Sequence, residues 1–71
     1  MTRKAKPSLL NAVALLSARP RKKLARGQVG TIVELLDKQT ALVEFSDNNG
    51  AAFAIEPCPL RDLIVLHSQP A

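Results

Sequence analysis

The sequence predicts an all-β fold of five short strands, with a single 3-10 turn before the last strand. Its length of 71 residues allows one domain with one small core. Hydrophobic residues make up 46% of the chain and aromatic residues only 3%, so the core must be mainly aliphatic. A β-branched run that begins at a glycine, followed further on by an Asn-Gly turn, is typical of β-hairpins.

A flexible basic arm, residues 1–8, precedes the folded part and shows no hydrophobic period. The apolar run over residues 11–17 suits a strand and a helical turn equally well by periodicity alone. We interpret it as a strand, because Pro20 stops a helix and strong β signals follow. The folded domain is expected over residues 9–67, before a polar tail at 68–71.

The clearest strand signal is the β-branched run between Gly27 and Leu35. Gly27 is expected to turn the chain into this strand. Gly30 lies inside the strand, where a missing side chain predicts a bulge, a sharp bend or a closely passing backbone. The two glycines fit no phosphate-binding motif, because no predicted helix follows them.

The rest of the chain divides at its turn residues. In the strand that returns from the first turn, Ala41, Val43 and Phe45 are predicted to point to one face. The next strand is expected to end before Pro57 and Pro59, because proline donates no hydrogen bond to a sheet. The remaining predicted elements, in chain order, are a turn at 36–40, a strand at 41–45, a turn at 47–50, a strand at 51–56, a 3-10 turn at 60–63 and a strand at 64–66.

Charge is polarised along the sequence. Residues 1–26 carry eight basic and no acidic residues, whereas residues 27–71 carry two basic and six acidic residues. A basic third on an acidic body attracts an anionic partner, either an acidic protein surface or complex or a nucleic acid, although a solvated surface has the same composition. The candidate partner-binding residues form a basic loop: Arg19, Arg21, Lys22, Lys23 and Arg26.

No catalytic constellation stands out in the sequence, and we predict neither enzymatic activity nor a metal or cofactor. The single histidine, His67, has no Cys, Ser or acidic partner at motif spacing. The single cysteine, Cys58, excludes an internal disulfide and is predicted to be a small semi-buried hydrophobe. The acids Glu34, Glu44 and Glu56 fall on successive predicted strands and are expected to face solvent opposite the core.

The N-terminal residues do not have the pattern of a signal peptide. The partly apolar run from Leu9 to Leu16 is followed by basic residues where a cleavage site would lie. The run covers about half of the roughly 20 apolar residues needed to cross a bilayer. We therefore expect a soluble, cytoplasmic protein, which also agrees with the use of a single cysteine.

Four segments stand out together: Val13–Leu16, Arg26–Glu34, Val43–Phe45 and Leu63–His67. They resemble a domain-of-unknown-function family of small bacterial proteins that look like stand-alone SH3-like barrels. The resemblance covers roughly residues 11–67 and implies a small five-stranded SH3-like barrel with no established activity. Some members look as if they accompany small toxin-like proteins, which implies a binding or antitoxin role. The loop between the first two strands tends to be acidic in these relatives and is basic here, so a different partner is expected.

A second, weaker similarity connects residues 23–33 with the KOW motif of ribosomal and transcription-elongation proteins. It implies a nucleic-acid-binding domain that uses the basic loop. The absence of Trp and Tyr counts against single-strand binding, which normally needs stacking platforms. We therefore predict a non-catalytic protein-interaction module, as an accessory or antitoxin-like partner of another protein. The alternative is a KOW-like nucleic-acid-binding domain.

Overall fold

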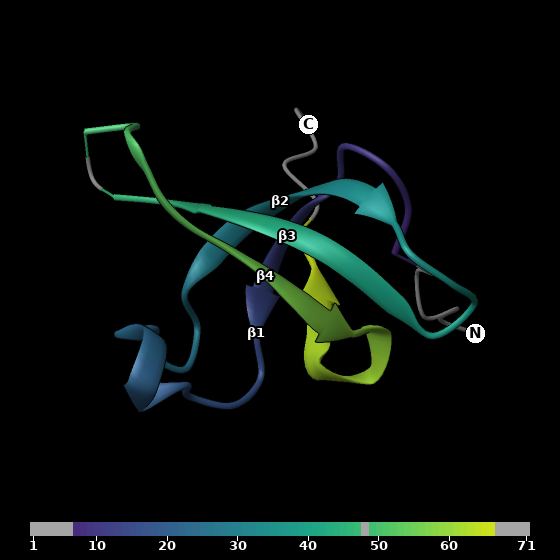
Figure 1. Cartoon of the computed structure of the whole chain (residues 1–71), viewed down its shortest axis with the longest axis horizontal. Coiled ribbons are helices and arrows are strands. Elements are labelled where there is room, and N and C mark those ends of the chain that lie inside the picture. Colours follow the sequence, from purple (N-terminus) through teal and green to yellow (C-terminus); the bar gives the residue numbers. More distant parts are fainter. Residues whose placement is uncertain (1–6, 48, 67–71) are drawn as a thin grey trace.

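The computed structural model describes residues 7–47 and 49–66, and it folds them into one antiparallel sheet (Figure 1). The strand order across the sheet is β4-β3-β2-β1-β5, so β4 and β5 form its two edges. Figure 1 shows the long β2–β3–β4 meander lying across the shorter strands β1 and β5. The elements are β1 (Ala12–Leu15), the 3-10 turn η1 (Pro20–Lys22), β2 (Val29–Leu35), β3 (Thr40–Ser46), β4 (Ala52–Pro59), the 3-10 turn η2 (Leu60–Asp62) and β5 (Leu63–Val65).

These elements confirm the predicted fold class, an all-β domain of five strands with a 3-10 turn before the last strand. The extra 3-10 turn, η1, lies in the basic loop, where the sequence predicted only a connection. The predicted tail at 68–71 and His67 lie outside the described residues, as do residues 1–6 of the predicted arm. In the part of the chain that the structure describes, no helix is long and apolar enough to cross a membrane.

The core lies between the meander and the β1–β5 pair and consists mainly of aliphatic side chains, as predicted. Ala41, Val43 and Phe45 are fully buried, which confirms that alternate residues of β3 point to one face. Phe45 is the largest of the fully buried side chains. The buried cluster comprises Val13, Leu15, Leu24, Ile32, Ala41, Val43, Phe45, Cys58 and Leu63.

Gly30 marks the place where β2 packs most closely on β3. It pairs with Phe45, and a Cβ atom at Gly30 would lie 2.7 Å from Val43 Cγ1 and 2.8 Å from the Glu44 carbonyl oxygen. Of the three predicted reasons for a glycine here, the structure therefore selects close approach of a neighbouring strand. The bulge in this strand lies three residues further on, at Val33, where the pairing with β3 shifts by one residue.

Two turns contain a glycine with a positive φ angle, which other residues adopt rarely. Gly27 has φ +85° and donates its backbone N–H to the Leu15 carbonyl at 2.7 Å, which turns the chain toward β2. Gly50 has φ +82° in the turn between β3 and β4. The Asp47 carboxylate accepts the backbone N–H groups of Asn49 and Ala51 at 2.8 and 3.1 Å, so the turn is fixed from within.

The predicted end of the fourth strand before Pro57 is wrong, because β4 continues to Pro59. The strand tolerates both prolines because it is an edge strand. The Pro57 carbonyl accepts a hydrogen bond from outside the sheet, so the backbone at residue 57 faces away from β3. Pro59, two residues further along, has the same orientation, and neither missing N–H removes a bond from the ladder.

Candidate functional site

The basic loop between β1 and β2 is an ordered structure with one apolar anchor. We call residues 16–28 the basic connector. Leu24 is buried in the core, and its backbone exchanges two hydrogen bonds with Arg19, at 2.8 and 3.1 Å. Pro20 begins η1, and Lys23 ends it with φ +59°. The connector is thereby held in a compact hairpin that is anchored to the core by Leu24.

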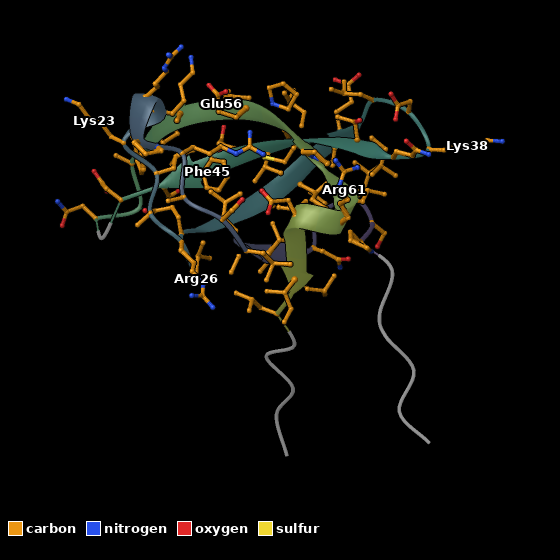
Figure 2. The ribbon with its side chains drawn as sticks, turned by 90° about the horizontal axis from the view of Figure 1, so that it is seen from below. Lys23, Arg26, Lys38, Phe45, Glu56 and Arg61 are labelled. Carbon is orange, nitrogen blue, oxygen red and sulfur yellow. The ribbon has the colours of Figure 1, made fainter. Side chains whose placement is uncertain are left out.

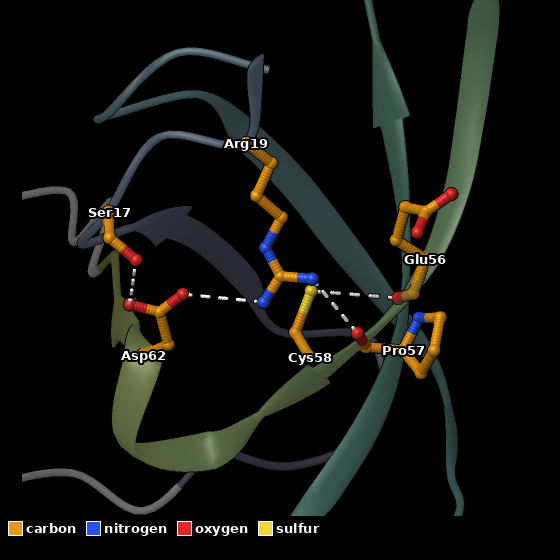
Figure 3. Close-up of polar contacts among 6 residues, drawn as sticks. All are labelled: Ser17, Arg19, Glu56, Pro57, Cys58 and Asp62. Atoms are coloured by element: carbon orange, nitrogen blue, oxygen red, sulfur yellow. Dashed lines mark hydrogen bonds and ion pairs between the residues drawn. The ribbon is translucent and has the colours of Figure 1, made fainter. Parts of the chain in front are cut away.

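Arg19 makes its polar contacts with other parts of the protein (Figure 3). Its guanidinium donates one hydrogen bond to the Pro57 carbonyl at 3.1 Å and forms an ion pair with Asp62 at 3.3 Å. Ser17 Oγ donates to the other oxygen of the same Asp62 carboxylate, at 2.8 Å. The partly buried Arg19 therefore joins the connector to edge strand β4 and to η2, and it has an architectural role.

Lys22 is the second cation of the connector that faces the protein. Its Nζ lies 3.5 Å from Glu56 Oε2, with side-chain exposures of 55% for Lys22 and 18% for Glu56. Glu56 pairs with Val43 and so lies on the core-facing side of β4, at its rim. This differs from the expectation that all three strand glutamates face solvent. The pair contributes little stability, because Lys22 remains half-exposed.

The other three predicted binding residues, Arg21, Lys23 and Arg26, are exposed. Within residues 7–47 and 49–66, their side chains take part in no ion pair or hydrogen bond. Figure 2 shows Lys23 and Arg26 extending away from the body at one end of the molecule. The structure thus divides the five predicted residues into two that face the protein and three that face outward.

A shallow depression of about 490 Å³ is lined by one of the outward-facing cations, Arg26. It is bounded on one side by the end of the connector and on the other by the start of the β3–β4 turn, with the outer face of β2 as its floor. Arg26 and Asp47 place opposite charges on its two sides. The side chains that give it its chemical character are Arg26, Gln28, Val29, Thr31, Ser46 and Asp47.

An apolar row leads across the outer face of the sheet into this depression. Ala14 pairs with Val29 on one side and with Ile64 on the other, so the three side chains share one cross-strand row. Val29 is 49% exposed and Ile64 is 48% exposed. This row was not predicted from the sequence, although side chains alternate along β2, so that Val29 faces outward where Gly30 and Ile32 face inward.

Cys58 lies in the core, next to the polar contacts that Arg19 makes with Pro57 and Asp62, and does not form part of a reactive site. Its side chain is fully buried, and Sγ lies 3.6 Å from the Glu56 carbonyl oxygen (Figure 3). Burial raises the pKa of the Cys58 thiol, Arg19 partly opposes this, and the Asp62 and Glu56 carboxylates add to it. The thiol is therefore held in its protonated, weakly nucleophilic form.

Comparison with known proteins gives one match. Residues 9–65 match the model of a family described as a domain of unknown function, DUF4926. No curated protein and no solved structure matches the chain significantly. The matched residues include all five strands of the sheet.

Proposed function

Since the chain belongs to the DUF4926 family, whose description assigns no activity, we propose from its geometry that it is a non-catalytic protein-binding module. The observation that carries this proposal is the cross-strand row in which the exposed Val29 and Ile64 flank the buried Ala14, and which opens into a depression with Arg26 at its rim. Apolar side chains beside an arginine are typical of the centre of a protein interface.

The partner surface should be acidic with exposed apolar side chains. Arg21, Lys23 and Arg26 supply three cations without an internal partner in the described structure, and Val29 and Ile64 supply apolar area nearby. A carboxylate of the partner would form charge-assisted hydrogen bonds with Arg26, while its apolar side chains cover the exposed row. A small aliphatic core gains stability from such a partner, because a ligand that binds only the folded state shifts unfolding.

The geometry favours binding through the loop and the sheet face over addition of a strand at the edge of β4. Proline occupies positions 57 and 59 of that strand, and Arg19 already donates to the Pro57 carbonyl. Both features remove backbone groups that an added strand would need. The strand order and the 3-10 turn before β5 support the assignment to SH3-like barrels, and an accessory or antitoxin-like role in the bacterial cytoplasm is part of this proposal.

The test is capture of a partner from the cell's own nuclease-treated lysate at low salt, followed by identification of the bound chain and measurement of its affinity. We expect Val29→Asp and Arg26→Glu each to weaken binding at least about tenfold, since each places a negative charge against an acidic surface. Leu36→Asp is the matched control, because Leu36 is 45% exposed, close to the 49% of Val29, but lies in the β2–β3 turn. If Val29→Asp and Leu36→Asp bind alike, the proposed surface is wrong.

A KOW-like nucleic-acid-binding domain is the alternative function, favoured by the exposure of Arg21, Lys23 and Arg26 on the basic connector. Each phosphate that a cation neutralises makes the affinity fall by about 0.7–0.9 log units per log unit of salt. Replacing Arg21, Lys23 and Arg26 by Gln should then reduce the salt slope of RNA or DNA binding by about 2–3. This alternative is rejected if the protein does not bind RNA or DNA, or if the triple Gln variant has the same salt slope as the wild type.

A further inference from the structure

A second cationic site lies on the otherwise acidic part of the chain. Residues 27–71 contain only two basic residues, Lys38 and Arg61, against six acidic ones. The two are far apart in the sequence, one in the β2–β3 turn and one in η2. Both nevertheless line the same depression, of about 280 Å³, together with Gln39 and Leu60.

The backbone fixes the two walls of this depression against each other. The Leu60 N–H donates to the Gln39 carbonyl at 2.7 Å, which joins η2 directly to the β2–β3 turn. The pairing of Thr40 with Pro59 continues this contact into the sheet. The β2–β3 turn is itself closed, because the Leu36 N–H donates to the Thr40 carbonyl at 2.9 Å. The places from which Lys38 and Arg61 extend are therefore set by the fold.

The acids next to these cations are occupied elsewhere. Asp37 Oδ1 accepts the backbone N–H of Gln39 at 2.7 Å. Asp62 uses one carboxylate oxygen for Ser17 and the other for Arg19. In the described residues neither Lys38 nor Arg61 forms an ion pair. Within the described residues, two positive charges thus remain at one small depression without an ion-pair partner.

We propose that Lys38 and Arg61 form a binding site for a small oxyanion, a carboxylate or phosphate group. Lysine contributes a point charge and arginine a planar fork that fits two oxygens, while Gln39 adds an amide donor. A volume of about 280 Å³ accepts one such group on a short stem and is below the usual size of a site for a whole nucleotide. Leu60 provides an apolar wall for the stem.

This site is separate from the proposed protein-binding surface. Figure 2 shows Lys23 and Arg26 at one end of the molecule, with Lys38 at the opposite end and Arg61 on that side of the centre. The two proposals can therefore fail independently. A free small molecule and a group carried on another chain would present the same oxyanion, and different titrants separate these two sources.

The test is a two-dimensional amide NMR titration of the full chain with inorganic phosphate, with acetate and with a short peptide ending in a free carboxylate, each at matched ionic strength against sodium chloride. We expect saturable shifts at Lys38, Gln39, Leu60 and Arg61 with the oxyanions and not with chloride. Tighter binding of the peptide than of acetate would indicate a group carried on another chain, and binding of acetate or phosphate at least as tight as that of the peptide would indicate a free small molecule.

Charge-removing variants decide between a site and a general effect of net charge. K38Q/R61Q should weaken oxyanion binding at least about tenfold, since it removes both charged donors. R21Q/K23Q removes the same charge at the other end and should leave the shifts at Gln39 and Leu60 intact. Shifts that do not saturate, or that both double variants abolish equally while unfolding curves stay unchanged, would overturn the proposal.

Discussion

Arg19 and Asp62 lie 43 residues apart in the sequence, and their side chains form an ion pair of 3.3 Å across the end of the sheet. The pair joins the basic connector to the 3-10 turn before β5. A residue that looks like part of a binding loop therefore holds the fold together. For the proposed function, this leaves the three outward-facing cations, Arg21, Lys23 and Arg26, to contact a partner.

Arg19→Ala should lower the free energy of unfolding by about 1–2 kcal/mol, because it removes the ion pair with Asp62 and the hydrogen bond to the Pro57 carbonyl. Urea unfolding followed by circular dichroism measures the loss. Arg19→Lys keeps the charge but lacks the planar fork, and it should recover only part of the stability. A change within 0.5 kcal/mol, as expected for the exposed control Arg21→Ala, would contradict the architectural role of Arg19.

Gly30→Ala should destabilise the protein by about 1–3 kcal/mol, because its Cβ would overlap Val43 Cγ1 and the Glu44 carbonyl. Gly27→Asn is the control, since nothing lies within 4 Å of a Cβ at Gly27 and asparagine tolerates its positive φ. Thermal unfolding of the two variants distinguishes steric contact from backbone strain. If Gly27→Asn is instead less stable than Gly30→Ala, the close approach at Gly30 is refuted.

The Cys58 thiol should resist thiol reagents in the folded protein and react fully on unfolding, because the side chain is buried. The raised pKa of the thiol also makes the free energy of unfolding depend on pH, with a loss at alkaline pH. The unfolded chain releases the thiol proton at lower pH than the folded chain, so this contribution to stability is complete below the ordinary thiol pKa and is lost as pH rises through the folded value. Unfolding at neutral and alkaline pH should therefore show a smaller alkaline loss for Cys58→Ala than for the wild type.

Val29→Thr and Ile64→Thr should change stability by no more than about 0.5 kcal/mol, since both side chains are half-exposed and face away from the core. The same substitutions should weaken partner binding, because they remove apolar area from the proposed surface. Val13→Thr, at a fully buried position of β1, is the comparison expected to reduce stability strongly. If the Val29 and Ile64 variants unfold as easily as Val13→Thr, these side chains belong to the core.

Local signals in the sequence were sufficient for the parts of the fold that depend on neighbouring residues. The alternation of Ala41, Val43 and Phe45 and the Asn-Gly turn both concern short segments, and the structure confirms them. The end of β4 was predicted wrongly, because an edge position depends on the order of strands in the sheet. Pro57 at an edge removes no ladder bond, and its own sequence neighbours do not reveal this.

The candidate site was predictable only as a set of charges. The clustering of basic residues in the connector is visible in the sequence, but which of them face inward depends on distant partners. Arg19 meets Asp62, and Lys22 meets Glu56, only after β4 and η2 are in place. The meeting of Lys38 and Arg61 at one depression has the same origin, since a hydrogen bond between two turns brings them together.

The most direct test of this account compares R21Q/K23Q/R26Q with the wild type in two measurements on the same preparation. Urea unfolding should give a free energy within about 0.5 kcal/mol of the wild type, because the three side chains have no internal ion-pair partner in the described structure. Binding to the captured partner should weaken at least about tenfold. Unchanged partner binding together with a loss of stability above about 1 kcal/mol would show that these cations hold the fold and do not recognise the partner.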